Sequence, residues 1–522
     1  MARYRTFLYN GDKYGAGLLE TTLFWAVEID WDNDGAFDGT NEARRVRSIA
    51  VTRGRSDFMK VGADGQGGFG RAQVGEVTLT LDNYDRRYDP WYAAGPLYGN
   101  LLPGRDVKIR IGYVGYIAPY FGAIISSVFR GKISDIVISQ DRSDPICTIK
   151  VVDGWQLLSD ARSTIELQTD ATSDLLIDAV LDDVGWPSAW GTDLDTGSDT
   201  IPYAWADDRD AFGVLHDIAE SEMGLVYVGA DGKFYFVNRH NLLLAASSVT
   251  VSESEVGNDP EISNPWEYIR NIVRVQANPR ALGSETEIWR LDEIRLLTPG
   301  QSITVWGSFR DSNYNLTIAQ DVVEPVATTD YTMNTDSAGG GTDLTASFTV
   351  TATIFAGSVK FVITNGHATL AGYITLLKVR GKPLELLNVA AAISEDTSSQ
   401  AIYGKRELKL DLPFQQNTNV ATDLADWIIT WIASAQPVLV IEIINRPVLQ
   451  FYYDLGTLIT FQGAYMGVDQ TFRIGQITHE SMETMQAIRT RLVLEPVPAA
   501  VAYWQLGTAG YSELGTTTRL AY

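Results

Sequence analysis

Apolar and polar residues alternate along several stretches in the first 160 residues of the chain. Val77, Leu79 and Leu81 alternate with threonine and aspartate, and the segment 107–112 (VKIRIG) repeats the pattern. Successive side chains of a strand point to opposite faces of a sheet, so an alternation with a period of two predicts half-buried β-strands. We therefore expect this part of the chain to be mainly β.

The pattern changes between residues 161 and 245. Apolar residues at helical spacing predict helices near 173–184 and 209–223. Two short apolar runs, Leu225–Val228 and Phe234–Val237, then flank an Asp-Gly turn, which is typical of a β-hairpin. The sequence here predicts a small α+β domain.

The rest of the chain returns mostly to alternation. Between residues 280 and 390, segments rich in serine, threonine and valine alternate as short strands, which favours a β-sandwich. A further helix is expected at Asn419–Ala433, and strands follow it up to residue 494.

The predicted fold class is mainly β with an α+β insert: two β-barrel domains flank a small α/β domain and a β-sandwich. The expected units are an N-terminal barrel (1–160), the α+β insert (161–279), the sandwich (280–395), a second barrel (396–498) and a C-terminal docking tail (499–522). Several domains are expected because 522 residues exceed what a single hydrophobic core usually organises.

An unusually long aromatic loop separates the strand around Leu79 from the strand at 107–112. Long loops inside compact domains are uncommon and usually functional, and aromatic and arginine side chains are enriched at protein interfaces. The same loop could instead pack on its own barrel, and the sequence leaves both interpretations open. The candidate interface residues are Tyr84, Arg86, Arg87, Tyr88, Trp91, Tyr92, Tyr98 and Arg105.

Two aromatic-Leu-Gly units lie near the end of the chain at a spacing of eight residues. The segment after residue 498 is too short to form a core of its own, so we expect it to dock on another subunit or a neighbouring protein through Trp504 and Tyr511. The alternative is a disordered tail in which the repetition is incidental.

An acidic stretch follows the first expected strand. Alternate aspartates with Gly35 at the sixth position match the front half of a calcium-binding loop, but Asn41 stands at the twelfth position and Glu42 comes one place late. The stretch is therefore either a calcium loop between strands or an acidic β-turn without metal. The candidate structural Ca²⁺ ligands are Asp30, Asp32, Asp34, the carbonyl of Ala36, and Asp38.

The composition of the chain excludes several classes of protein. A formal net charge of −24 argues against direct nucleic-acid binding, which needs a basic footprint. The sequence contains no apolar run of membrane-spanning length, and its start lacks the apolar core of a signal peptide. The single cysteine, Cys147, rules out an internal disulfide framework.

No catalytic signature stands out, so no catalytic residue and no other cofactor is predicted. The four histidines form no HxH or HExxH pair, and no GxSxG motif occurs. A pair of catalytic carboxylates leaves no sequence signature, so a hydrolase of that kind stays open as the least favoured class. We expect a protein that is not an enzyme.

Several segments together resemble a known family. These are LDNYDRRYDP and GPLYGNLLPGRDVKIRIGY in the aromatic loop, FRGKISDI (Phe129–Ile136) and VVDGWQLLSDA (Val151–Ala161). As a set they are similar to minor tail proteins of long-tailed bacteriophages, and in particular to tail-tip (baseplate) hub proteins. The resemblance covers about the first half of the chain and the part after residue 395.

The resemblance implies a structural virion protein: a homotrimeric hub that closes the tail tube and joins the six-fold tube to a three-fold tip. It implies a place at the tail tip after assembly in the host cytoplasm. The implied partners are a distal tail protein or tube ring, the tape-measure protein and other tip proteins. The alternative is a distal-tail or minor tail protein whose β-sandwich binds a host surface glycan, and a cell-wall hydrolase comes third.

Overall fold

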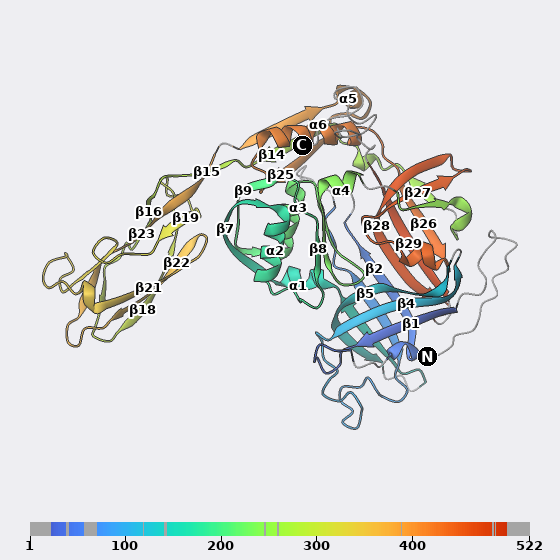
Figure 1. Cartoon of the computed structure of the whole chain (residues 1–522), viewed down its shortest axis with the longest axis horizontal. Coiled ribbons are helices and arrows are strands. Elements are labelled where there is room, and N and C mark those ends of the chain that lie inside the picture. The colour runs from blue at the N-terminus through green and yellow to red at the C-terminus, as the bar shows by residue number, and fades with distance from the viewer. Residues whose placement is uncertain are drawn as a thin grey trace.

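The computed structural model describes residues 22–37, 41–56, 70–117, 120–139, 143–244, 247–257, 260–387, 389–482, 485 and 487–497. Asp38 and the tail residues Trp504 and Tyr511 lie outside these ranges. The described chain is mainly β. A large sheet, an α+β part and a small helix-covered sheet lie together, and a β-sandwich projects away from them (Figure 1).

A sheet of 12 strands connects the two ends of the described chain. Its main path is β1 (Thr22–Ile29), β4 (Asp106–Ile117), β5 (Tyr120–Ser139), β6 (Ile146–Val152), β3 (Glu76–Asp82), β2 (Val46–Gly54), β28 (Val468–Met482), β29 (Ala487–Pro496), β26 (Val438–Ile444) and β13 (Glu261–Ser263). The other two strands are β12 (Val249–Ser252) and β27 (Leu458–Gly463), and β27 pairs with β28.

The expected pair of closed barrels is not confirmed by this topology. Among the described strands, the pairing ends at β1 on one side and at β13 on the other, so no closed barrel forms. The long strand β28 connects the two β-rich regions. Its first part pairs with β27, whereas Gln476–Glu480 pair in antiparallel register with Ala50–Gly54 of β2. One long strand thus joins the two β-rich regions into a single sheet.

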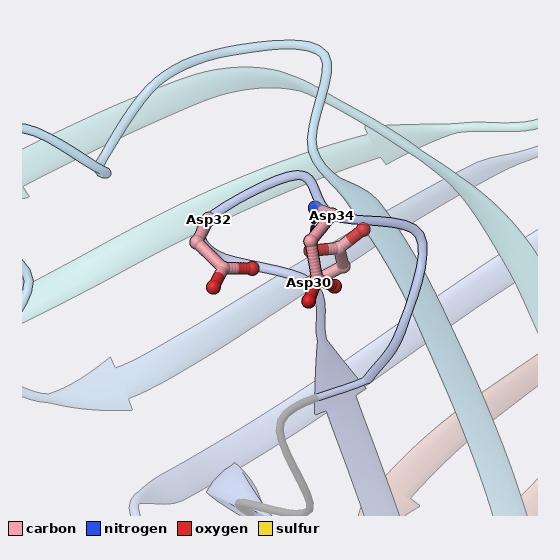
Figure 2. Close-up of side chains that lie close together, drawn as sticks. All are labelled: Asp30, Asp32 and Asp34. Carbon is pink, nitrogen blue, oxygen red and sulfur yellow. Dashed lines mark hydrogen bonds between the residues drawn. The ribbon is translucent and has the colours of Figure 1, made fainter.

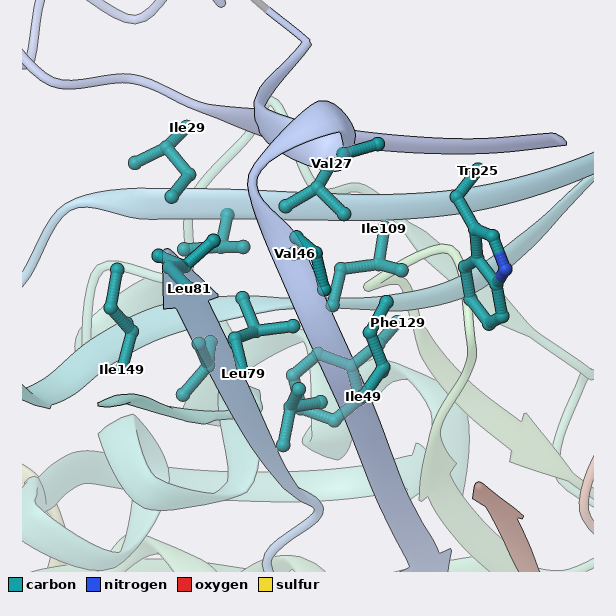
Figure 3. Packing of buried hydrophobic residues seen from close by; sticks show 14 of the residues in the cluster. Trp25, Val27, Ile29, Val46, Ile49, Leu79, Leu81, Ile109, Phe129 and Ile149 are labelled. Atoms are coloured by element: carbon teal, nitrogen blue, oxygen red, sulfur yellow. The ribbon is translucent and has the colours of Figure 1, made fainter. Parts of the chain in front are cut away.

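Each half of this sheet has its own hydrophobic core. The N-terminal core buries alternate residues of its strands, including Val27, Leu79, Ile109 and Ile149 (Figure 3). The C-terminal core is built in the same way around Ile441, Phe461, Phe472 and Leu494. The alternation in the sequence therefore predicted the buried faces correctly.

The α+β part follows its expected pattern. The hairpin strands are β10 (Leu225–Val228) and β11 (Phe234–Val237), and β8 (Thr192–Leu194) adds a parallel strand to β11. Antiparallel strands β7 (Arg162–Thr172) and β9 (Thr200–Asp210) form a second ribbon. The helices of this part are α1 (Gly154–Asp160), α2 (Ser173–Asp183), α3 (Ala211–Ser221) and α4 (Arg239–Leu244).

A third small unit combines segments from distant parts of the sequence. Strand β14 (Ile272–Ala277) pairs antiparallel with β24 (Ala390–Glu395) and parallel with β25 (Glu407–Leu412). Helix α6 (Thr418–Ile432) packs on this sheet through Leu424, Ile428 and Ile432. The expected second barrel includes β25 and α6, whereas the structure places both on β14. The remaining helices are α5 (Thr397–Tyr403) and α7 (Pro447–Phe451).

The projecting module contains two packed sheets, as expected for a sandwich. The long strand β23 (Gly372–Leu386) pairs with β15 (Arg280–Leu282), β16 (Thr286–Arg290), β17 (Arg295–Leu297), β19 (Ala319–Val323) and β20 (Tyr331–Asn334). The second sheet has the order β18 (Ser302–Ser308), β22 (Ser358–Asn365), β21 (Phe348–Ile354). Val359, Phe361 and Ile374 lie in the core between them.

Four short 3-10 helices complete the described elements. They are η1 (Glu42–Arg44), η2 (Glu253–Glu255), η3 (Trp266–Tyr268) and η4 (Thr345–Ser347). Of these, η1 bears on function because Glu42, its first residue, lies beneath the aromatic loop.

Candidate functional site

The aromatic loop between β3 and β4 is a chain of consecutive turns. Backbone N–H groups of Arg86, Asp89, Tyr92, Gly95 and Tyr98 each donate to the carbonyl three residues earlier, at 2.8–3.2 Å. Such turns satisfy backbone groups locally, so a loop without helix or strand can still hold one conformation.

A buried carboxylate fastens the loop to the N-terminal core. Glu42 is 4% exposed and accepts hydrogen bonds from the Tyr88 hydroxyl at 2.6 Å and from Arg87 Nη2 at 2.7 Å. The indole N–H of Trp31 donates to the same carboxylate at 3.2 Å. Burial and the Glu42 charge raise the pKa of Tyr88 above its ordinary value, so its hydroxyl stays protonated and donates. Two further loop residues, Leu97 and Leu101, are buried in the same core.

The opposite face of the loop carries large exposed side chains. Tyr84 and Trp91 are each 80% exposed, Tyr98 is 55% exposed and Leu102 is 50% exposed. Exposed aromatic and apolar residues that are close together in sequence, on a backbone held from below, are typical of a contact surface for another protein.

The structure divides the predicted interface residues into two groups. Tyr84, Trp91 and Tyr98 are exposed and available for contact. Tyr88 is 0% exposed, so its assignment as an interface residue is corrected: it is a core residue that holds the loop. The reason is that its hydroxyl has an internal acceptor in Glu42, which makes burial of the ring favourable.

The arginines of the loop mostly form contacts within the protein. Arg86 pairs with Asp89 at 2.7 Å and lies over the Tyr92 ring, with 4.3 Å between its guanidinium carbon and the ring centroid. Arg87 is held by Glu42, and Arg105 donates from Nε to the carbonyl of Asn100 at 3.2 Å. These contacts stiffen the loop, and Arg86 remains about half exposed, with 54% of its side chain open to solvent.

Glu42, Leu97 and Leu101 are the residues that sequence reasoning missed. Glu42 drew notice only because it stands one place late for a calcium loop. Its actual role is to accept hydrogen bonds from the aromatic loop. The available signal was its position two residues before a basic pair (Arg44, Arg45) in a segment of otherwise alternating strands.

The acidic stretch after β1 brings three aspartates together (Figure 2). One carboxylate oxygen from each of Asp30, Asp32 and Asp34 lies within 4.8 Å of the others. The Asp30 carboxylate accepts from the backbone N–H of Asp34 at 3.2 Å and of Gly35 at 3.0 Å, and Gly35 has a φ of 86°. These bonds shape a tight turn, in which the backbone N–H of Ala36 also donates to the Asp34 carboxylate at 2.8 Å. The Ca²⁺ site remains a prediction.

The histidines have structural partners. His216 Nε2 accepts from the Ala72 N–H at 3.0 Å while Nδ1 lies 2.8 Å from the Phe212 carbonyl, and His479 Nδ1 contacts Thr490 Oγ1 at 2.8 Å. Burial lowers the pKa of both histidines to about 3, so both are neutral at neutral pH. Burial also raises the pKa of the Cys147 thiol to about 12, which makes it a weak nucleophile.

Two buried carboxylates with raised pKa values also have structural roles. Burial raises the pKa of Asp153 to about 7, and Asp153 caps α1 by accepting from the Trp155 N–H at 3.0 Å. Burial raises the pKa of Glu222 to about 7 as well, and Glu222 accepts from the Ser173 hydroxyl at 2.8 Å and the Ser198 N–H at 3.0 Å.

Trp306 is an exposed aromatic residue of the sandwich. Trp306 is 60% exposed, stacks with Phe355 at a centroid distance of 5.7 Å, and has the Lys360 ammonium 5.7 Å from its ring. Trp289 and Tyr331 pack against the sandwich core instead. Of these three aromatic residues, Trp306 is therefore the exposed one.

Among the described residues, no helix has the length and apolar character needed to cross a bilayer.

Several solved structures align with most of this chain. The 43 kDa tail protein of prophage MuSo2 from Shewanella oneidensis is 11% identical, and the alignment covers 90% of this chain and 98% of that chain with a TM-score of 0.47. A tail protein from Neisseria meningitidis MC58 is 9% identical, with 90% and 96% covered and a TM-score of 0.47. Prophage tail protein gp18 from Listeria monocytogenes EGD-e is 8% identical, with 90% and 94% covered and a TM-score of 0.40.

No family model and no curated protein matches the sequence. The three aligned chains are phage or bacterial tail proteins, the class that the sequence segments resemble. At these identities the alignments transfer no role to any residue of this chain.

Proposed function

We propose that this chain is a structural protein of the tail of a long-tailed bacteriophage. Within that class we assign it to the tail tip, as the homotrimeric hub that closes the tail tube. The observation that carries the proposal is the aromatic loop. The segment that resembles hub proteins presents Tyr84, Trp91 and Tyr98 to solvent while Tyr88 anchors it to the core.

The arrangement of the two β-rich regions supports a hub. Each chain carries two cores within one sheet, so three chains would offer six β-rich units to a six-fold tube and keep three-fold order below. The aromatic loop would contact the next subunit or the neighbouring ring. The partners would be a distal tail protein or tube ring, the tape-measure protein and other tip proteins.

The negative charge of the chain supports a DNA-delivery role. A basic channel lining would hold DNA through release of its counterions, whereas an acidic or neutral lining lets DNA pass. With a net charge of −24, we expect the channel face of the assembled ring to be net acidic or neutral.

The oligomeric state tests the hub assignment. Sedimentation equilibrium of the purified chain should give a species of three times the 57.5 kDa chain mass, alone or on addition of its distal tail protein. Images of assembled tips should show this protein with three-fold symmetry. A six-fold or monomeric protein in the tip would contradict the assignment.

A second function is favoured by Trp306: binding of a host surface glycan by the sandwich. Exposed tryptophan rings stack on sugar faces, and the Lys360 ammonium beside the ring would donate hydrogen bonds to sugar hydroxyl oxygens. Trp306→Ala should abolish retention of the protein on host cell-wall glycans. Tyr314→Ala, at a residue 80% exposed on the same module, should leave retention unchanged. Equal retention of both variants would remove this candidate.

A further inference from the structure

A cavity of about 50 Å³ lies where three parts of the molecule meet. Helix α3 contributes Glu220, helix α6 contributes Trp427 and Trp431, and strand β28 contributes Arg473. Because a single water needs roughly 10–15 Å³ by this measure, the cavity has room for a group of a few heavy atoms.

One wall of the cavity is the buried guanidinium of Arg473. Arg473 is 6% exposed, and its Nη2 donates to the Leu242 carbonyl at 2.8 Å. Its Nε has no hydrogen-bond acceptor, and in the described parts of the chain no carboxylate forms an ion pair with it. Burial and the nearby charge of Arg55 lower the pKa of Arg473 to about 9, while the charge of Glu495 on the neighbouring strand acts in the opposite direction, so the side chain is still a cation at neutral pH.

The other charged groups at the cavity are paired elsewhere. Arg55 forms an ion pair with Glu495, and Arg239 lies 3.5 Å from Asp199. Glu220 is the carboxylate on the cavity wall, and Arg71 holds both of its oxygens at 3.0 Å. The cavity is therefore lined by three guanidinium groups, and the carboxylates near them already have partners.

A buried cation normally has a counterion, because removing it from water without one is costly. The planar guanidinium fork matches the two oxygens of a carboxylate. Trp427, Trp431 and Met223 give the same cavity an apolar side that suits a short hydrocarbon group next to that carboxylate. From this geometry we propose that the cavity binds a small carboxylate, with Arg473 as its principal partner.

The carboxylate could belong to a free organic acid or to the side chain of an acidic residue from another protein. Both sources share the same recognition chemistry. The proposal does not depend on the assignment to a phage tail, because it concerns only groups inside this chain.

Thermal unfolding of the full-length protein tests the proposal. Sodium acetate, compared with sodium chloride at equal ionic strength, should raise the unfolding temperature by on the order of 1 °C at about tenfold excess over the dissociation constant. N-acetylglutamate amide serves as the probe for an acidic side chain. Stabilisation by acetate alone would identify a free acid, and stabilisation by both probes would also admit a protein side chain. Stabilisation by neither would overturn the proposal.

Two variants separate specific binding from a general salt effect. Arg473→Met replaces the guanidinium with an apolar side chain of similar length and should lose the acetate response. Arg290→Met removes an arginine that is 50% exposed and paired with Glu287 in the sandwich, and it should keep the response. An acetate response that persists in Arg473→Met would overturn the proposal.

A direct measurement on the unaltered protein covers the case in which Arg473→Met does not fold. Isothermal titration of the wild-type chain with acetate should show saturable binding of one equivalent. Formate should compete with acetate for this binding, and chloride should not. The absence of saturable heat would overturn the proposal without any variant.

Discussion

The hydroxyl of Tyr88 donates a 2.6 Å hydrogen bond to the carboxylate of Glu42 inside the N-terminal core. The two residues are 46 positions apart, and their bond ties the base of the exposed aromatic loop to η1. The loop can therefore present bulky side chains to solvent without losing its shape.

Removing this hydrogen bond should destabilise the protein. Tyr88→Phe leaves the ring in place but deprives the buried Glu42 carboxylate of one donor, which should lower the free energy of unfolding by about 1–3 kcal/mol. Denaturant unfolding followed by tryptophan fluorescence measures the change. Tyr84→Phe, at an exposed position, should stay within about 0.5 kcal/mol of wild type. Equal effects of the two substitutions would contradict the role of Tyr88.

Removing the exposed aromatic side chains should affect assembly and not folding. The variant Tyr84→Ala/Trp91→Ala/Tyr98→Ala should weaken self-association or partner binding at least about tenfold, because exposed aromatic residues dominate interface energies. Its unfolding midpoint should change little, because these side chains bury little surface in the single chain. Sedimentation velocity and chemical unfolding measure the two effects. Normal assembly of the triple variant would exclude the loop as an interface.

Calcium should stabilise the protein through the aspartates after β1. If Ca²⁺ is bound there, saturation at about 100 times its dissociation constant adds about 2.7 kcal/mol to the free energy of unfolding. The unfolding temperature should then rise with added Ca²⁺ and fall with a chelator. Asp32→Asn/Asp34→Asn should abolish the response, whereas Asp336→Asn in the sandwich should preserve it. A chelator-insensitive wild type would show that the stretch is a metal-free turn.

His479 should make stability fall as the pH drops below neutrality. Its pKa in the folded protein is lowered to about 3 from the ordinary value of 6.5, so the unfolded chain binds a proton first. Stability is therefore complete above pH 6.5 and is lost progressively between pH 6.5 and pH 3. At pH 5 the loss from this residue should be about 2 kcal/mol.

Comparing the pH dependence of stability in wild type and in His479→Gln isolates the contribution of His479. In His479→Gln, the drop in unfolding free energy between pH 7.5 and pH 5.0 should be smaller than in wild type by about 2 kcal/mol. Asp153 and Glu222, whose pKa values are raised to about 7, act in the opposite direction but do so equally in both proteins. Parallel pH profiles of wild type and variant would show that His479 does not titrate differently in the two states.

The sequence predicted local structure well and side-chain environment poorly. The alternation around Leu79 and the Asp-Gly hairpin after Val228 depend on neighbours in the chain, and both appear as expected. The pairing of β25 with β14 joins residues about 135 positions apart, and no local pattern specifies it. Likewise, the letters YDRRY show an aromatic, charged loop, but the buried or exposed position of Tyr88 and Tyr84 depends on where Glu42 lies.

The antiparallel pairing of β2 with β28 also sets a constraint on synthesis. β2 ends at Gly54 and β28 begins at Val468, so roughly 400 residues must be translated before β2 meets this partner, which takes about 20–80 s at about 5–20 residues per second. During that interval the nascent N-terminal region has an unpaired strand edge, which is open to pairing with other chains. When many copies of this protein are translated close together, their unpaired edges can meet. A chaperone that covers this edge until the last strands emerge would therefore reduce pairing between chains.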